Sequence, residues 1–147
     1  MPVAVVWLPD VAVCLLGIHA PPQVPKDPSG MGPYVDWLVE RIGDGRVVRG
    51  LEPCATGAPV VLSGDFNHVP GSGTIDRLLA RGLVDPLAGT GLASLTWPSG
   101  GGWPNLPVFR LDHVLVGALD IAELRKTRVP GSDHQGWGFV VQPASVR

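Results

Sequence analysis

A few polar residues of this chain have the types and the spacing that a hydrolytic site needs. Most of them lie at the end of an apolar run that predicts a strand, or in the loop after it. They are His19, Asp65, Asn67, Asp112, Asp133 and His134. Because strand ends meet at one rim of a sheet, we expect these carboxylates, the amide and the imidazoles to converge there. Such a set can hold a hard divalent cation and a phosphate against it.

Each side-chain type indicates a part in that chemistry. The carboxylate of Asp65 can orient or deprotonate a water, and Asn67 can donate its amide to a phosphoryl oxygen. The carboxylate of Asp133 can ligate Mg²⁺. The imidazole of His134 can donate a hydrogen bond or a proton to the phosphate as charge builds. A buried Asp112 can hold that imidazole in one tautomer and raise its basicity.

Each short motif also has a purely structural interpretation. The Asp and Asn of Gly64–Asn67 can hydrogen-bond their own backbone in a turn. His19 can be a surface imidazole, and His68 is expected to be solvated in its loop. We expect His113 to be structural, because alternation along a strand turns it away from Asp112.

The length and composition predict one globular domain. The chain has 147 residues, of which 45% are hydrophobic and 16% charged, a balance that excludes a disordered, self-repelling chain. The formal net charge is -2, so the chain does not bind nucleic acid by bulk positive charge. Trp97, Trp103 and Trp137 are either a stacking surface for bases or packing residues beneath Gly/Pro loops. Cys14 and Cys54 can form one disulfide or none.

No targeting segment is predicted, and the localisation stays unassigned. The apolar N-terminus is interrupted by Pro9 and Asp10 and lacks the positive region of a signal peptide. The apolar run Val11–Ile18 is far shorter than the roughly 18–20 residues that span a bilayer. A turn between two short buried strands is the better interpretation.

The elements that must position the polar residues are mostly strands. A helix is predicted from Pro33, and a second is capped by Ser72 or Thr74 and ends at Gly82. Runs of strands with few helices between them favour an α+β fold with a mixed or antiparallel sheet. The predicted strands are Val3–Trp7, Val11–Ile18, Val60–Leu62, Phe109–Val116, Ile121–Val129 and Trp137–Val141.

The order of the polar motifs resembles the endonuclease/exonuclease/phosphatase superfamily. That group includes deoxyribonuclease-I-like nucleases, apurinic endonucleases, inositol-polyphosphate phosphatases and sphingomyelinases. The motifs that carry the resemblance are His19 after a strand, Ser63–Asn67, Arg110–Val114 and Gly131–His134. The segment Thr96–Pro98 looks like a bacterial branch whose members are often membrane-anchored. The resemblance implies a four-layer αββα sandwich, a bound Mg²⁺ or Mn²⁺, and hydrolysis of a phosphoester by water attack on phosphorus.

The resemblance also implies a role for each matched residue. Asp65 and Asn67 would activate and orient the attacking water and contact the scissile phosphate. His19 would contact the phosphate from the other side, and Asp112 would pair with His134. The substrate would be a phosphoester, whether nucleic acid, phospholipid or a phosphorylated small molecule.

The metal ligands implied by the resemblance are Asp65 and Asp133. However, the family's Asn motif and its Gln–Glu motif, whose Glu is the principal metal ligand, have no counterpart before His19. The resemblance therefore implies that residues 1–147 are the C-terminal portion of the family's domain, with an incomplete sandwich. Three alternatives stay open: an active hydrolase, an incompetent phosphate-binding fragment that needs a missing N-terminal segment or a partner chain, and a lipid-surface binding module.

Overall fold

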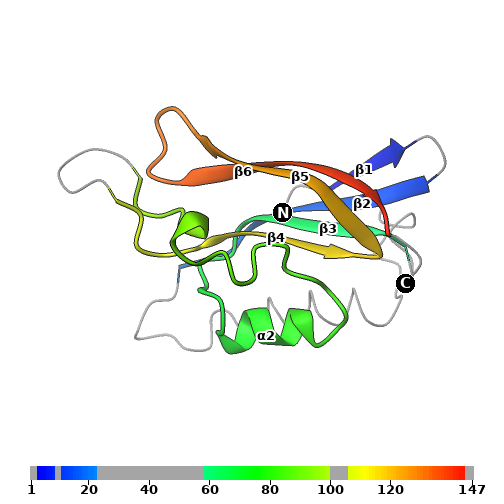
Figure 1. Ribbon diagram of the computed structural model, residues 1–147, viewed down its shortest axis with the longest axis horizontal. Coiled ribbons are helices and arrows are strands. Elements are labelled where there is room, and N and C mark those ends of the chain that lie inside the picture. The colour runs from blue at the N-terminus through cyan, green and yellow to red at the C-terminus, as the bar shows by residue number, and fades with distance from the viewer. Residues whose placement is uncertain (1–2, 9–10, 23–57, 100–105, 145–147) are drawn as a thin grey trace.

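The computed structural model describes residues 3–8, 11–22, 58–99 and 106–144. The predicted helix from Pro33 and the side chain of Trp103 lie outside these residues. The elements are β1 (Val3–Leu8), β2 (Val11–His19), β3 (Val60–Asp65), α2 (Gly73–Leu79), the 3₁₀ helix η2 (Gly91–Ser94), β4 (Asp112–Gly117), β5 (Leu119–Arg128) and β6 (Gln135–Pro143) (Figure 1).

The described strands form two sheets of different kinds. The larger sheet has the order β1-β2-β3-β4, in which β2 and β3 are parallel and the other two pairs are antiparallel. Strands β5 and β6 form a separate antiparallel pair. The prediction of a mixed sheet with few helices is thus confirmed for the described residues. The four-layer arrangement and its incompleteness stay predictions.

The two faces of the larger sheet are covered by different elements. Figure 1 shows α2 on one side of the sheet and the β5–β6 pair on the other. Because side chains alternate along a strand, β2, β3 and β4 each contribute to both apolar layers. The layer beneath α2 contains Cys14, Leu16, Leu62, Ile75, Leu78 and Leu115. The layer beneath β5–β6 contains Val13, Val61, Val114, Leu124, Trp137 and Phe139.

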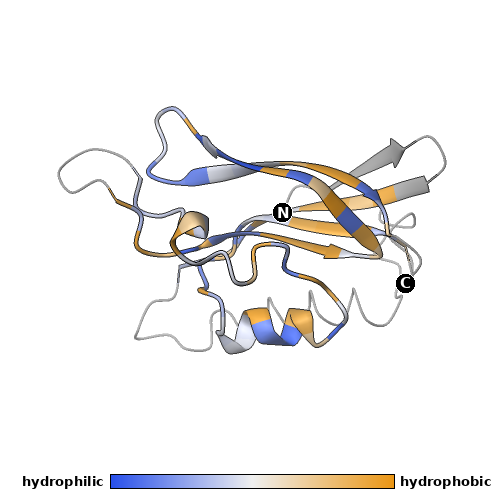
Figure 2. Ribbon diagram, viewed as in Figure 1, coloured by the Kyte–Doolittle hydropathy of each residue, from blue (hydrophilic) through white to orange (hydrophobic). Residues whose placement is uncertain are grey.

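Figure 2 shows hydrophobic residues in the parts of β3 and β4 that lie between these layers. The ionisable residues of the two strands, Asp65 of β3 and Asp112 and His113 of β4, lie at one end. Cys14 of β2 is buried and disulfide-bonded, which answers the question that the sequence left open. None of the described helices is long and apolar enough to cross a membrane.

Two predicted boundaries differ from the structure. The helix expected to end at Gly82 ends at Leu79. Strand β4 begins at Asp112 rather than Phe109, because Phe109 pairs with Trp97 in an isolated bridge instead of joining the sheet. The turn Gly91–Ser94 is a short 3₁₀ helix that the sequence did not predict. The helix cap is as expected, since the Ser72 side chain accepts a hydrogen bond from the Ile75 amide.

Gly64 is the position in β3 where a side chain does not fit. Its φ is +138°, and an added Cβ would lie 2.1 Å from the carbonyl oxygen of Ile18. We expect Gly64→Ala to lower the free energy of unfolding by about 2 kcal/mol or more, because the variant adds both backbone strain and a clash with the neighbouring strand. Urea unfolding of the purified protein measures this loss.

A matched control separates the strain from the clash. Gly71 has a φ of +78° and no atom within 4 Å of an added Cβ. Gly71→Ala should therefore cost only about 1 kcal/mol, the penalty of left-handed backbone for alanine. Equal losses in the two variants would contradict the role given to the close approach at Gly64.

Candidate active site

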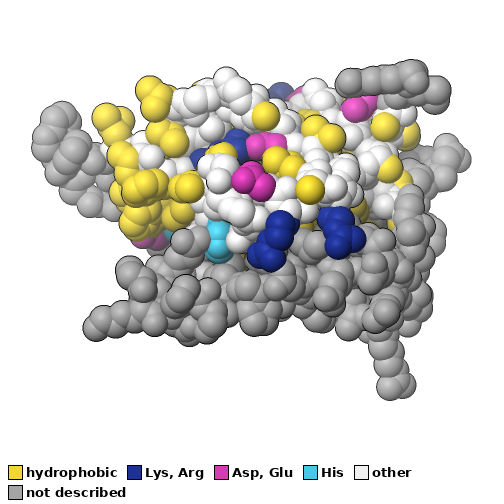
Figure 3. Space-filling view, turned by 90° about the horizontal axis from the view of Figure 1, so that it is seen from below, with side chains coloured by type: hydrophobic (Ala, Val, Ile, Leu, Met, Phe, Trp, Pro, Cys, Tyr) yellow, Lys and Arg dark blue, Asp and Glu magenta, His cyan; other side chains and the backbone are white. Residues whose placement is uncertain are grey.

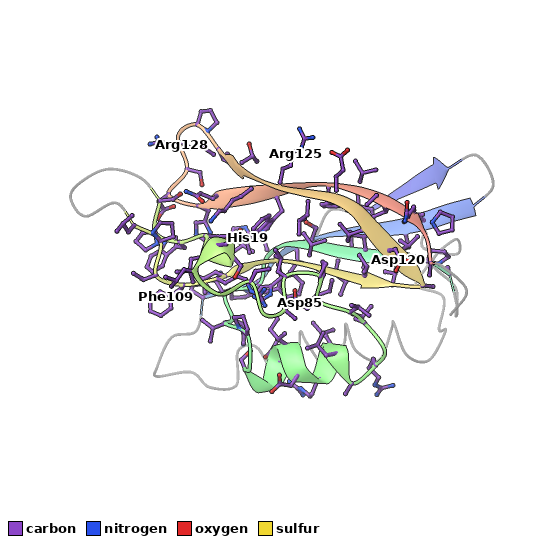
Figure 4. All side chains as sticks on the ribbon, viewed as in Figure 1. His19, Asp85, Phe109, Asp120, Arg125 and Arg128 are labelled. Atoms are coloured by element: carbon purple, nitrogen blue, oxygen red, sulfur yellow. The ribbon has the colours of Figure 1, made fainter. Side chains whose placement is uncertain are left out.

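Three neighbouring strands bring polar residues to one rim of the larger sheet. Asp65 is the last residue of β3, and it lies opposite His19 of β2 and Asp112 of β4 in the strand register. The two parallel strands end at this rim, and the antiparallel β4 begins there. Figure 4 shows His19 and Phe109 toward this end of the sheet, whereas Asp120 lies near the opposite end.

His134 completes the group from the loop before β6. Its Nδ1 donates a hydrogen bond to Asp112 Oδ2 at 2.8 Å, so the predicted pairing of these two residues is present. Because a carboxylate can only accept, Nδ1 carries the proton and the orientation of the ring is fixed. The other ring nitrogen, Nε2, lies 4.0 Å from Asp65 Oδ2, which is too far for a hydrogen bond.

The environment of Asp65 raises the pKa of its carboxyl group. Burial is the main cause, and the negative charge of Asp112 adds to it. The backbone hydrogen bond from Asn67 and the charges of His134 and His19 act in the opposite direction. The net effect is a carboxylate that is a stronger base than an exposed aspartate.

The same residues form a potential cation site. One ligand atom from each of Asp65, Asp112 and His134 lies within 4.8 Å of the others. The two carboxylates sit directly opposite each other on adjacent strands, where like charges repel. A bound cation would relieve this repulsion. Carboxylate oxygens suit Mg²⁺ and Mn²⁺, and the imidazole is also compatible with Mn²⁺.

Asp133 lies apart from this cluster in the structure. It is exposed, and its Oδ2 accepts a hydrogen bond from Trp97 Nε1 at 3.0 Å. That hydrogen bond holds the pKa of the Asp133 carboxyl group below its usual range. Asp65 is thus a member of the cluster and Asp133 is not, and ligation by Asp133 stays a prediction.

Asn67 donates hydrogen bonds to Asp65 and to the backbone of Ala20. Its amide nitrogen donates to Asp65 Oδ1 at 2.8 Å, and its Nδ2 donates to the Ala20 carbonyl at 2.6 Å and to Asp65 Oδ2 at 3.2 Å. The first of these bonds is the local turn that the sequence also allowed. Donation from Asn67 to a phosphoryl oxygen would require Nδ2 to give up one of its acceptors, the more distant being Asp65.

The remaining two histidines are structural. His113, predicted to be structural, is fully buried, and its Nε2 donates to the His68 carbonyl at 2.7 Å. The expectation that His68 is solvated is wrong, because only 4% of it is exposed. Its Nδ1 donates to the Phe66 carbonyl at 2.7 Å, which folds the ring back against the loop.

The burial of His113 should make the fold sensitive to acid. Burial lowers the pKa of His113 to about 4, from 6.5 in the unfolded chain. Below pH 6.5 the unfolded chain therefore binds a proton that the folded protein does not. The contribution of His113 to stability is complete above pH 6.5 and falls by about 3 kcal/mol as the pH approaches 4.

Unfolding by urea at a series of pH values between 7 and 4 measures this contribution. His113→Gln keeps a donor for the His68 carbonyl but has no titrating group. Its stability should fall less steeply with decreasing pH than that of the unchanged protein. Parallel pH profiles for the two proteins would contradict the assignment.

Two residues outside the predicted site support the Asp112–His134 pair. Thr96, predicted only as part of the Thr96–Pro98 motif, accepts hydrogen bonds at Oγ1 from the amides of Leu111 and Asp112. Trp137, predicted as a packing or stacking residue, donates from Nε1 to the Asp112 carbonyl at 3.2 Å. Neither bond has a local sequence signal, because each joins segments far apart in the chain.

An apolar surface adjoins the segment that carries Trp97. The ring of Trp97 stacks on Phe109, with centroids 6.1 Å apart, and lies 6.2 Å from the ring of His134. Figure 3 shows hydrophobic side chains gathered at one end of the face in view. A groove of about 430 Å³ is lined by Leu92, Leu95, Leu106, Pro107, Val108 and Lys126.

Comparisons with known proteins agree with this geometry. The sequence profile of the Endonuclease/Exonuclease/phosphatase family matches residues 2–134. No curated protein matches the sequence. An endonuclease/exonuclease/phosphatase family protein from Leptotrichia buccalis has a similar structure, with a TM-score of 0.62 and 17% identity over 94% of this chain and 52% of that one.

Two further solved structures are similar at the same level. Truncated TDP2 from Caenorhabditis elegans gives a TM-score of 0.57 at 18% identity, over 92% of this chain and 56% of that one. A mannosyl-6-phosphatase from Bacteroides thetaiotaomicron gives 0.50 at 16% identity, over 90% of this chain and 51% of its own. The chain thus spans about half the length of these structures. With the profile match over most of its residues, the chain belongs to the endonuclease/exonuclease/phosphatase family.

Proposed function

We propose that this chain is a divalent-metal-dependent phosphoester hydrolase in which water attacks phosphorus. The observation that carries the proposal is the cluster of Asp65, Asp112 and His134 at one rim of the sheet, in a chain of this family. Two carboxylates and an oriented imidazole supply the base, the ligands and the hydrogen-bond donor that the reaction requires.

In this proposal Asp112 and His134 stabilise the negative charge on the phosphate. Asp112 fixes the orientation of the His134 ring by accepting a hydrogen bond from its Nδ1. The free Nε2 donates a hydrogen bond to a phosphoryl oxygen. Asp65 accepts a proton from the attacking water. His19, next to Asp65 in the strand register, contacts the phosphate from the other side.

Asp65 and Asp112 would hold the metal ion, with Asp133 proposed as a further ligand from the loop. When bound, Mg²⁺ or Mn²⁺ polarises the phosphoryl oxygen and neutralises negative charge on it. Asn67 orients Asp65 by donating from its backbone amide to Oδ1 and from its Nδ2 to Oδ2.

The substrate is proposed as a phosphoester: a nucleic acid, a phospholipid or a phosphorylated small molecule. The net charge of -2 disfavours duplex nucleic acid, whose binding relies on many cationic contacts. A second candidate is a phosphate-binding chain that is completed by another segment or partner. The observation in its favour is that the chain spans about half of each matched structure.

Removal of the metal tests the proposal. The purified chain should hydrolyse bis-p-nitrophenyl phosphate or p-nitrophenyl phosphate in the presence of Mn²⁺ or Mg²⁺. EDTA should abolish the release of nitrophenol, and excess Mn²⁺ should restore it. Hydrolysis that is unchanged by EDTA would rule out a metal-dependent site. Mn²⁺ and phosphate binding without hydrolysis would favour the second candidate.

A further inference from the structure

We infer that Thr96 is the positioning residue of this site, because it is bonded to both segments that carry the Asp112–His134 pair. The inference rests on the proposed function, since a positioning role affects activity only if Asp112 and His134 act on a substrate. The bonds themselves are independent of that function.

The first link is to the segment that enters β4. Thr96 is fully buried, and its Oγ1 accepts from the amides of Leu111 and Asp112, each at 3.2 Å. One side-chain oxygen thus satisfies two consecutive backbone donors at the point where β4 begins. Without it, both amides would be left unsatisfied next to a buried carboxylate.

The second link is to the segment that carries His134. The Thr96 carbonyl accepts from the Gln135 amide at 3.0 Å, one residue after His134. The two partners of the 2.8 Å bond between His134 and Asp112 are therefore held by the same residue, from its side chain and from its backbone.

Asp112 is also held at its carbonyl group. Trp137 Nε1 donates to that oxygen at 3.2 Å, while Thr96 accepts from the amide of the same residue. The peptide groups on both sides of the Asp112 side chain are thus anchored. Hydrolytic and metal sites require their groups to be held within about 0.5 Å, which is what such anchoring achieves.

Thr96→Val tests the inference, because valine keeps the shape of threonine but cannot accept a hydrogen bond. Thr96→Ser keeps the oxygen and should rescue the site. Ile75→Val is the matched control, since Ile75 is equally buried but lies in α2 on the other face of the sheet. It destabilises the core without touching either link.

The first readout is the downfield proton resonance of His134 Nδ1–H in the metal-free protein, assigned by its absence from His134→Asn. We expect the resonance in the unchanged protein, in Thr96→Ser and in Ile75→Val, and its loss in Thr96→Val. The second readout is Mn²⁺ affinity, which should fall about 10-fold or more in Thr96→Val only.

A Thr96→Val variant with the resonance and the Mn²⁺ affinity of Ile75→Val would overturn the inference. If Thr96→Val does not fold, Thr96→Cys replaces it, because sulfur is a weak acceptor and the same loss is expected. The two proposals fail differently. A protein without metal binding or hydrolysis, in which Thr96→Val still loses the resonance, would keep the positioning role and refute the function.

Discussion

Asp65→Asn should hydrolyse a phosphodiester at least about 10³-fold more slowly than the unchanged protein. The substitution keeps the shape of the side chain but removes its negative charge. The charge is needed twice in the proposed reaction, to accept a proton from water and to hold the metal. General-base catalysis alone accounts for about 10²–10⁴-fold, so the combined loss should be large.

The surroundings of Asp65 make this the most sensitive position. It is the middle residue of the rim, with His19 and Asp112 beside it on the adjacent strands. Asn67 donates to its Oδ1, and an amide oxygen at that position can still accept this hydrogen bond. The longer bond from Asn67 Nδ2 to Oδ2 is lost, but Nδ2 keeps its bond to the Ala20 carbonyl. The loop should therefore keep its conformation, and the loss of rate should reflect the chemistry rather than unfolding.

Initial rates of nitrophenol release at saturating Mn²⁺ measure the effect, with circular dichroism to check the fold. Asp76→Asn is the matched control, because it makes the same chemical change on the exposed side of α2. It should keep the rate within a factor of two. A folded Asp65→Asn protein with more than a tenth of the normal rate would refute the role of this carboxylate.

The rim of polar residues could be predicted from the sequence for a local reason. Each strand is marked by its own apolar run and its own turn residues, so its end is visible without knowledge of the rest of the fold. His19 and Asp65 follow from this rule, whereas the sequence predicts Asp112 inside the strand Phe109–Val116. The strand register places the three residues side by side. The alternation that buries His113 is also local.

Contacts between distant segments had no such signal. The side chain of Thr96 reaches Leu111 and Asp112 because the bridge between Trp97 and Phe109 brings the two segments together. The His68 carbonyl accepts a hydrogen bond from His113 Nε2, which lies on β4, far from His68 in the sequence. These bonds depend on the tertiary structure, which sequence periodicity does not predict.

The ion pair of Arg110 with Asp85 is another contact of this kind, and it carries the largest expected effect on stability. Both side chains are buried, with 4% and 6% of their surface exposed. Asp85 also accepts from the Leu87 amide at 2.9 Å, and Arg110 lies two residues before the catalytic candidate Asp112. The pair therefore joins the loop after α2 to the segment that enters β4.

Asp85→Ala should lower the free energy of unfolding by about 4 kcal/mol. It leaves the Arg110 guanidinium buried without its counter-ion, and breaking a buried pair in this way costs about 3–5 kcal/mol. The penalty is not offset elsewhere, since Arg110 Nε already has no hydrogen-bond partner among the described residues. Urea unfolding at neutral pH measures the loss.

Two comparisons test whether the loss of stability comes from the buried Arg110 charge that has lost its counter-ion. Glu123→Ala breaks the ion pair between Glu123 and Arg125, whose side chains are 55% and 81% exposed, respectively. This variant should change the free energy of unfolding by less than about 0.5 kcal/mol. The double variant Asp85→Leu with Arg110→Met removes both charges and fills the space with apolar groups. It should recover most of the stability, because a buried pair is worth little relative to well-packed apolar side chains. If the double variant is as unstable as Asp85→Ala, the hydrogen bonds of the pair, rather than the unpaired charge, hold this segment in place.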